Sequence, residues 1–332
     1  MRVALRPALQ LAGPVVLLVA TAVVSNGFSK AHQLEFENAL VMTAIVVALY
    51  VFMGNSGVIS FGHVSFVAVG AYLAGLLTVD PQTKAFTMPG LLPVLRHSHI
   101  GALPSLALAA AVGGIYALVV GLPLMRLSGL PAGIATFAVL GITYNVLYYW
   151  QKIGPTAQTL SDIPESGRWT LAAGTIIAVV VAYAYQRSRF GRMLRATRED
   201  PAAARASGIS VYRQRLAGFT LSGALAGLAG GLFVHELGLI TPDLFYLDLT
   251  FVTLAMLVFG GVGSLWGAVL GALAISALNS FLGDAENTVH VGFRLTLPAG
   301  TRLVTIGAVM ALVIILRPSG LTGGREFGWR RR

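Results

Sequence analysis

The chain has 332 residues, of which 56% are hydrophobic and 11% charged, and its mean hydropathy is +0.77. A soluble domain carries about 25% charged residues, so this composition excludes an ordinary soluble protein. Apolar runs long enough to cross a bilayer core of roughly 30 Å recur from end to end. The sequence therefore predicts an all-α polytopic membrane helical bundle, with residues 1–332 forming a single transmembrane domain.

The chain contains no cysteine, which excludes disulfides, thiolate chemistry and cysteine-based metal sites. Its formal net charge of +10 could suggest a nucleic-acid partner. The basic residues lie instead in the loops expected on one side of a membrane. We therefore expect the protein to contact membrane lipid and to bind no nucleic acid. The basic head and apolar run of residues 1–25 could form a cleaved signal peptide. We favour a first span, because every later apolar segment is also a span.

We expect about ten transmembrane spans, and the segment between the sixth and seventh is predicted to include a cytoplasmic coupling helix. A glycine-rich break at 260–264 divides the apolar stretch 247–282, which is too long for one helix, into the eighth and ninth spans. The other predicted spans cover approximately residues 8–24, 39–53, 64–79, 102–122, 131–150, 169–185, 216–234 and 299–316.

The charge distribution predicts the orientation of this bundle. Segments on the same side as both termini hold 16 Lys and Arg residues and three acids, whereas the other side holds 7 and 10. Because basic residues concentrate in cytoplasmic loops, both termini are expected on the cytoplasmic side of the membrane. Tyr148, Tyr149 and Trp150 then lie at the outer interface, where aromatic residues are common.

The seventh predicted span carries small residues at a helical spacing. Gly223, Gly227 and Gly231 recur every four residues, and Gly263, Gly267 and Gly271 repeat this pattern at the ninth span. Small residues at this spacing let helix backbones approach each other closely. The pattern predicts tight helix packing and does not by itself indicate a functional role.

The longest polar interruption, residues 187–215, carries the clearest local signals. Phe190, Met193, Leu194 and Thr197 recur at the spacing of one helix face, and arginines lie beside that face. This pattern predicts a short amphipathic helix along the inner membrane surface.

A second short helix is predicted directly after the first. Asp200 is a typical N-cap, Pro201 suits the first helical position, residues 202–206 are good helix formers, and Gly208 is a typical stop. A helix of about seven residues is marginal alone in water, so we expect a partner to hold it in a groove. The alternative is a solvated basic loop that only sets the topology.

A glycine- and serine-rich break at 54–63 is the first candidate for the translocation pathway. Asn55, Ser56, Ser60 and His63 place polar groups among glycines at the end of a span. Non-helical backbone at membrane depth occurs where protein buries it or where it lines a water-filled cavity. The alternative, which we favour for His63, is a position at the inner interface where it caps a helix end.

Other polar residues offer weaker candidates. Asn279 lies in the ninth span, where a hydrogen bond between helices is the more common role. His235, Glu236 and Asp243 follow the seventh span near the predicted outer mouth. They could meet a binding protein or a zwitterionic solute, and an ordinary solvated rim is the favoured alternative.

Four stretches together carry a resemblance to a known family. Residues 188–233 and 54–77, the run GGVGSLWGAVLGALAI at 260–275 and LRPSGLTG at 316–323 resemble LivM-type permease subunits of ABC importers for branched-chain amino acids. The loop 153–166 departs from the glycine-rich stretch usual in that family, which leaves the substrate class open. The resemblance implies that the cytoplasmic loop contacts an ATP-hydrolysing subunit. The residues it marks as contact or framing positions are Arg195, Glu199, Asp200, Pro201, Ala204 and Gly208.

The resemblance implies a transport subunit that works by alternating access. Its expected partners are a second permease subunit, two ATP-binding subunits and a soluble substrate-binding protein. The chain has no phosphate-binding loop and no catalytic or metal-binding motif, so ATP would be used by a partner and no cofactor is expected here. Alternatives are an ABC permease for urea or a short amide, a stand-alone secondary carrier and an intramembrane enzyme. The carrier would need charged residues within spans, and the enzyme would need facing carboxylates or histidines.

Overall fold

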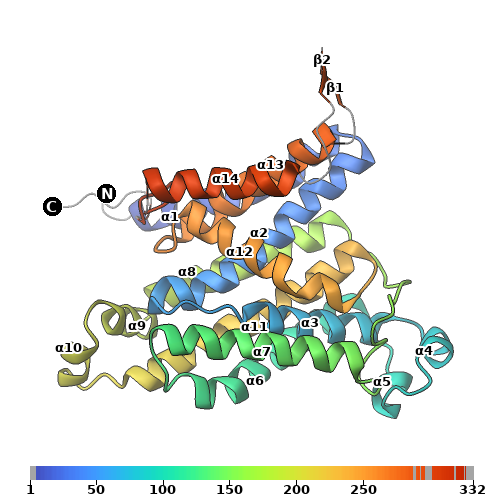
Figure 1. The fold of residues 1–332 in the computed structure, drawn as a ribbon, viewed down its shortest axis with the longest axis horizontal. Helices are drawn as coiled ribbons and strands as arrows, with labels where there is room; N and C mark the ends of the chain where they lie inside the picture. Colours follow the sequence, from blue (N-terminus) through green and yellow to red (C-terminus); the bar gives the residue numbers. More distant parts are fainter. Residues whose placement is uncertain are drawn as a thin grey trace.

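The computed structural model describes residues 5–286, 289–291, 293–295, 301–317, 319–324 and 326, and almost all regular structure in them is helical (Figure 1). The ten apolar helices are α1 (Leu5–Val24), α2 (Lys30–Ser56), α3 (His63–Thr78), α6 (Ala102–Leu124), α7 (Leu130–Tyr149), α8 (Arg168–Arg187), α11 (Val211–Leu237), α12 (Leu247–Gly260), α13 (Leu265–Glu286) and α14 (Thr301–Leu316). The shorter elements are η1 (Ser25–Gly27), α4 (Pro81–Thr87), α5 (Pro93–His97), α9 (Arg189–Glu199), α10 (Pro201–Ala206), η2 (Pro242–Phe245) and the antiparallel strands β1 (Val289–Val291) and β2 (Phe293–Leu295).

The predicted all-α polytopic bundle is confirmed, and each predicted span coincides with one apolar helix. By length and composition, eight helical segments in the described part of the chain can cross a membrane. A ninth arises if α3 and α4, which meet at a bend of 114°, count as one broken span. The last predicted span is α14, with 16 residues; its predicted first two residues, 299 and 300, lie outside the described residues.

The centre of the bundle is α11, which packs against α6, α3 and α2. The predicted small-residue contacts are found here. A Cβ on Gly230 would lie 1.9 Å from the carbonyl oxygen of Val67 on α3, and one on Gly227 would lie 2.3 Å from that of Ala109 on α6. A Cβ on Gly271 of α13 would lie 2.1 Å from the carbonyl oxygen of Met256 on α12. These backbones touch because no side chain separates them.

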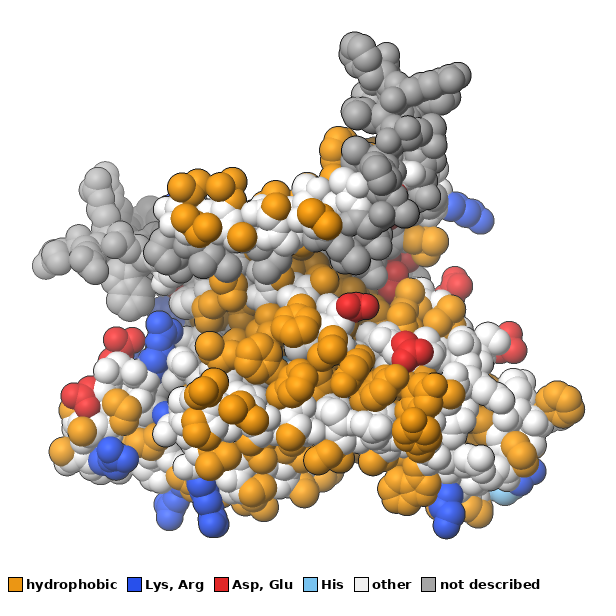
Figure 2. Space-filling view, viewed as in Figure 1, with side chains coloured by type: hydrophobic (Ala, Val, Ile, Leu, Met, Phe, Trp, Pro, Cys, Tyr) orange, Lys and Arg blue, Asp and Glu red, His pale blue; other side chains and the backbone are white. Residues whose placement is uncertain are grey.

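The surface reflects an apolar environment around the bundle. Apolar side chains cover much of the visible outside, and most charged side chains lie toward the two ends (Figure 2). Both α2 and α11 are mostly buried, whereas α1 is mostly exposed. Burial therefore decreases from the central helices α11 and α2 to helices at the edge of the bundle such as α1.

One end of the bundle carries α9 and α10, and we call it the basic end. The first part of α1, the end of α8, the break between α12 and α13, and the residues Gly324 and Glu326 also meet there, because all of them border one cavity. Hydrogen bonds from the amides of Leu321 and Thr322 to the carbonyls of Phe259 and Gly260 attach this last segment to α12.

The opposite end is formed by α4, α5 and the loop 150–167. Lys84 on α4 is fully buried and donates to the carbonyl oxygens of Leu76 and Leu95, each at 2.9 Å, and to that of Ser98. A buried ammonium needs such acceptors, and the carbonyls at the end of α3 offer negative partial charge. This side chain ties the short helices to the end of α3.

The contact at Gly230 predicts a large effect of a small substitution. Gly230→Ala would push a methyl group against the α3 backbone, so we expect a loss of about 1–3 kcal/mol of stability from overpacking. Thermal unfolding of the purified chain in detergent measures this loss. The control is Gly141→Ala on α7, where nothing lies within 4 Å of the added Cβ. Equal unfolding midpoints for the two variants would contradict the close approach.

Candidate functional site

The helix α9 packs against α8, α2 and α11 at the basic end. Its start is capped by Ser188, whose hydroxyl accepts a hydrogen bond from the Gly191 amide at 3.1 Å. Leu194 and Thr197 are buried against the bundle, whereas Phe190 is 43% exposed. The predicted short helix is therefore present, and its position along the inner membrane surface stays a prediction. The chain turns sharply between α8 and α9, so the first turn of α9 buries Gly191 instead of Phe190.

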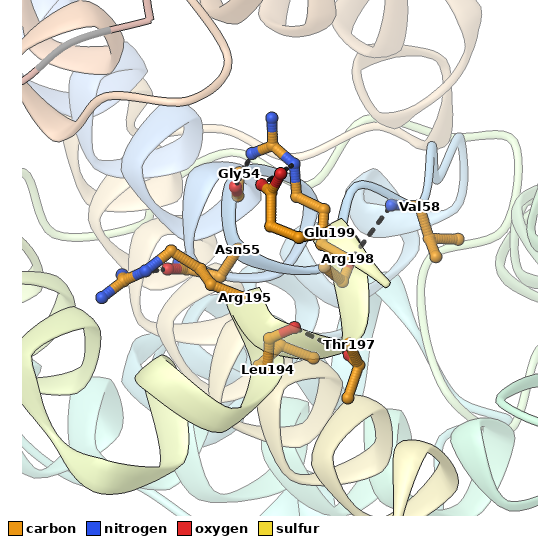
Figure 3. Close-up of polar contacts among 9 residues, drawn as sticks. Gly54, Asn55, Val58, Leu194, Arg195, Thr197, Arg198 and Glu199 are labelled. Carbon is orange, nitrogen blue, oxygen red and sulfur yellow. Dashed lines mark hydrogen bonds and ion pairs between the residues drawn. The ribbon is translucent and has the colours of Figure 1, made fainter. Parts of the chain in front are cut away.

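Two arginines on consecutive turns of α9 hold the end of α2 (Figure 3). Arg195 donates to the side-chain oxygen of Asn55 at 2.8 Å and to the carbonyl oxygen of Gln186 at 2.6 Å. Arg198 donates to the carbonyl oxygen of Gly54 at 2.7 Å. The last carbonyls of a helix lack intrahelical partners and carry negative partial charge, so cations suit this position.

Arg195 was a candidate from the sequence, whereas Arg198 was not. Both belong to an arginine repeat with a spacing of three along 189–198, which places them on neighbouring turns of the helix. The repeat predicts that these arginine side chains leave the helix on neighbouring turns. It cannot reveal their acceptors on α2, which lie about 140 residues away in the sequence.

The short helix α10 has the predicted start and stop. The Asp200 carboxylate accepts hydrogen bonds from the amides of Ala202 and Ala203 at 2.8 and 3.0 Å, with Pro201 at the first helical position. These bonds, that of Ala203 first, hold the pKa of Asp200 below its usual value. Gly208 follows with φ +80°, a conformation that favours glycine, and ends the helix.

The sequence candidates on this segment divide into two groups. Ala204 is buried against the chain itself, so it frames the helix and does not face outward. Asp200, Pro201 and Gly208 are exposed, and so is Glu199, which lies 3.8 Å from the Nε atom of Arg198. The outward face of α10 also presents the small side chains of Ala202, Ala203 and Ala206.

The four polar candidates of the break after α2 are all buried. The side-chain amide of Asn55 donates to the carbonyl of Val51 at 3.0 Å while its oxygen accepts from Arg195. Ser56 accepts a hydrogen bond from the amide of Val58 at 3.1 Å. Asn55 and Ser56 therefore stabilise the end of α2.

His63 connects three helices. Its ring lies 2.8 Å from the hydroxyls of both Ser60 and Ser222, and Ser222 in turn donates to the carbonyl of Ala48 at 2.6 Å. The rings of Phe52, Phe66 and Phe219 surround the imidazole. The first residue of α3 is His63 itself. Ser60 and His63 are thus packed inside the bundle, and a role in the pathway stays a prediction.

Asn279 is partly buried on α13 and is not part of this cluster. Its predicted contribution to the pathway also stays a prediction. His235, another polar residue considered from the sequence, contacts the Ser105 hydroxyl at 3.1 Å and the Pro164 carbonyl at 2.9 Å at the opposite end.

A cavity of about 730 Å³ opens at the basic end between α9 and the last described residues. It is lined by Gln10, Tyr50, Gln186, Arg187, Arg192, Arg195, Glu199, Gly263, Gly324 and Glu326. Burial raises the pKa of Glu326, whose carboxylate accepts from the Leu265 amide at 2.7 Å. In the described part of the chain, no group of three His, Asp or Glu residues could hold a metal ion.

Comparisons with known proteins decide the family. Residues 37–315 match the model of the branched-chain amino acid transport system permease component. The chain belongs to this permease family. The match includes α9, α10 and the end of α2, and no solved structure matches the chain.

Three relatives show the range of this permease family. The high-affinity branched-chain amino acid transport system permease protein LivM of Escherichia coli is 26% identical over 310 residues, covering 83% of this chain and 66% of LivM. The probable branched-chain amino acid transport permease protein LivH of Methanocaldococcus jannaschii is 28% identical, covering 87% and 90%. The autoinducer 2 import system permease protein LsrC of Klebsiella pneumoniae is 33% identical, covering 63% and 59%. This chain spans just under two thirds of the length of LivM.

The bond between Arg195 and Asn55 predicts an energetic coupling between α9 and α2. In a double-mutant cycle of Arg195→Gln and Asn55→Ala, we expect a coupling energy of about 1–2 kcal/mol, because the bond involves a charged donor. Thermal unfolding in detergent gives the four stabilities. The control cycle pairs Asn55→Ala with Arg192→Gln, an exposed residue of the same helix that forms no hydrogen bond with Asn55. Equal coupling in both cycles would contradict a specific bond.

The Asp200 cap predicts a local effect on α10. In Asp200→Ala, we expect the amides of Ala202 and Ala203 to exchange faster with deuterium, whereas Asp200→Asn keeps an acceptor at the cap. Because the folded pKa is lowered, the cap stabilises α10 above about pH 4 and is lost as the pH falls through the folded value. Hydrogen exchange, corrected for intrinsic rates, measures this. Unchanged exchange in Asp200→Ala would show that the cap is dispensable.

Proposed function

We propose that this chain is the membrane-spanning subunit of an ABC importer for branched-chain or related amino acids. In this proposal it forms the translocation pathway, and separate subunits hydrolyse ATP. The observation that carries the proposal is the exposed, capped helix α10, joined through α9 to the end of α2. The permease family and the LivM relatives support it.

The proposed orientation places the basic end in the cytoplasm of a cell with a bacterial-type inner membrane. Eight of the 23 Lys and Arg residues lie in the segment 187–215 alone, and the start of α1 borders the same cavity as this segment. The excess of basic residues on cytoplasmic loops supports this orientation. Both termini would then be cytoplasmic.

The ATPase contact is proposed on the outward face of α10. This face carries only the small side chains of Ala202, Ala203 and Ala206, so the helix can fit into a groove on another protein. Glu199 and Arg205 are exposed beside it and can pair with charges of the partner. A helix of six residues has little surface of its own to bury, and a partner would supply the missing contacts.

Movement of α10 would reach the spans through the α9 arginines. Asp200 joins the two short helices without a linker, so a displacement of α10 acts directly on α9. Arg195 and Arg198 would transmit it to the end of α2 and the adjoining break before α3. In alternating access, this movement changes which side of the pathway is open.

The proposed partners are a second permease subunit, two ATP-binding subunits and a soluble substrate-binding protein. An amino acid is favoured as substrate because permeases of branched-chain amino acid transport systems match most of the chain. The autoinducer 2 permeases match a smaller share of it. Urea or a short amide remains the alternative substrate, since the loop 153–166 departs from the glycine-rich stretch usual in the family.

Affinity purification from the native membrane tests the docking helix. The tagged chain should recover ATPases with a phosphate-binding loop, identified by mass spectrometry. Ala202→Trp places a bulky side chain on the exposed face of α10 without removing its cap, and should reduce this recovery at least about tenfold, equivalent to a loss of about 1.4 kcal/mol.

The matched control is Gln82→Trp on α4, which begins with the same Asp–Pro cap at the opposite end. It changes the equivalent exposed position and should leave ATPase recovery intact. If wild-type chain is recovered alone and transports in liposomes without ATP, the importer proposal is wrong and a secondary carrier becomes the leading hypothesis.

A further inference from the structure

A cluster of tyrosines and a carboxylate lies at the end of the bundle opposite α9 and α10. The hydroxyl of Tyr144, on α7, donates to the Asp243 carboxylate of η2 at 2.7 Å. The rings of Tyr144 and Tyr246 stack with centroids 4.2 Å apart, and Tyr148 lies 5.6 Å from Tyr144. Two parts of the chain separated by about 100 residues thus build one polar and aromatic surface.

The Asp243 carboxylate is exposed to solvent, and its hydrogen bond from Tyr144 leaves its negative charge without a cationic partner among the described residues. It forms no ion pair with any Lys, Arg or His among the residues that the structure describes. Asp248, in the first turn of α12, adds a second exposed carboxylate nearby in the chain. Red carboxylates interrupt the apolar surface over α12 in Figure 2. An exposed carboxylate without a cationic partner can accept hydrogen bonds from a cationic group.

A buried hydroxyl behind this surface also lacks a partner. Tyr72 on α3 is 2% exposed, and its hydroxyl has no hydrogen-bond partner among the described residues. Its ring packs against Phe245 of η2, two residues after Asp243, with centroids 6.2 Å apart. A buried hydroxyl without a partner is costly. This unsatisfied hydroxyl lies directly behind η2, the element that carries Asp243.

We propose that Asp243, Tyr144 and Tyr246, with the Tyr72 hydroxyl behind them, form a subsite for the ammonium group of the transported amino acid. This inference rests on the proposed function and names a contact within it. An ammonium group has three donors, which Asp243 and tyrosine oxygens can accept, and tyrosine ring faces attract cations. The subsite therefore retains solutes with a primary ammonium group and not those with only a carboxylate or an amide.

The transport test uses the assembled importer in proteoliposomes with its substrate-binding protein. Asp243→Asn removes the charge but keeps an acceptor for Tyr144. We expect the maximal rate of leucine uptake to fall about tenfold, as for loss of one partly desolvated charge contact. ATPase recovery should not change. The control is Asp162→Asn, which removes one exposed charge from the loop 150–167 at the same end.

A binding test on the full chain in nanodiscs separates solute contact from receptor docking. Saturation-transfer NMR should show contact for 3-methylbutylamine but not for 4-methylpentanoate, and Asp243→Asn should abolish the amine signal while Asp162→Asn keeps it. An amine signal unchanged in Asp243→Asn, or leucine uptake at the wild-type rate, would overturn the subsite.

A third outcome assigns Asp243 to another partner. If Asp243→Asn raises the concentration of binding protein needed for half-maximal uptake and leaves the maximal rate unchanged, the carboxylate contacts a basic residue of that protein. The subsite is then wrong. Failure to recover any ATPase would overturn the proposed importer instead, and the NMR result on the chain alone distinguishes the two failures.

Discussion

The arrangement of the basic end depends on how the carbonyl groups at the end of α2 are satisfied. A helix end buried in a membrane protein must find donors from the protein, because lipid supplies none. Here Arg198 and Arg195 supply them from α9, through the Gly54 carbonyl and the Asn55 side chain. The same bonds that stabilise α2 therefore fix α9, and with it α10, to the body of the bundle.

The tightly packed centre of the bundle transmits a displacement of one helix to its neighbours, because it has little room to deform locally. Backbones of α11, α3 and α6 touch at glycines, so these helices cannot move closer to each other. A displacement at the basic end must then be taken up by movements of whole helices or at breaks such as residues 57–62. His63 and its serine and phenylalanine neighbours close that break on the bundle side, where they hold α2, α3 and α11 together.

Local signals in the sequence predicted local structure well. Asp200, Pro201 and Gly208 define the start and stop of α10 through interactions that reach at most a few residues. The local sequence is therefore enough to predict this helix. Apolar length likewise predicted every long helix. The residues of α9 that the bundle buries, Leu194 and Thr197, depend on how α9 packs against α8, α2 and α11, which the helix period alone does not give.

Contacts between distant parts of the chain could not be predicted in this way. The acceptor of Arg198 lies 144 residues earlier, and the partner of Tyr144 lies 99 residues later. Asp243 drew attention in the sequence beside His235 and Glu236, its neighbours along the chain. The fold instead joins it to a tyrosine of α7, which no spacing rule indicates. A sequence reveals each polar residue of a membrane bundle individually. Which polar residues come into contact with each other is decided by the packing of the helices.

The helix α12 joins the two ends at which the proposed functions lie. It begins beside Tyr246 and Asp248, and its last carbonyls accept the amides of Leu321 and Thr322. The adjoining Gly263 and Gly324 border the same cavity as Arg195 and Glu199. A rigid helix carries a displacement along its whole length, so a displacement of the end of α12 would reach the tyrosine and carboxylate surface at its start. The proposed solute subsite and the cavity beside α9 therefore lie at the two ends of one helix.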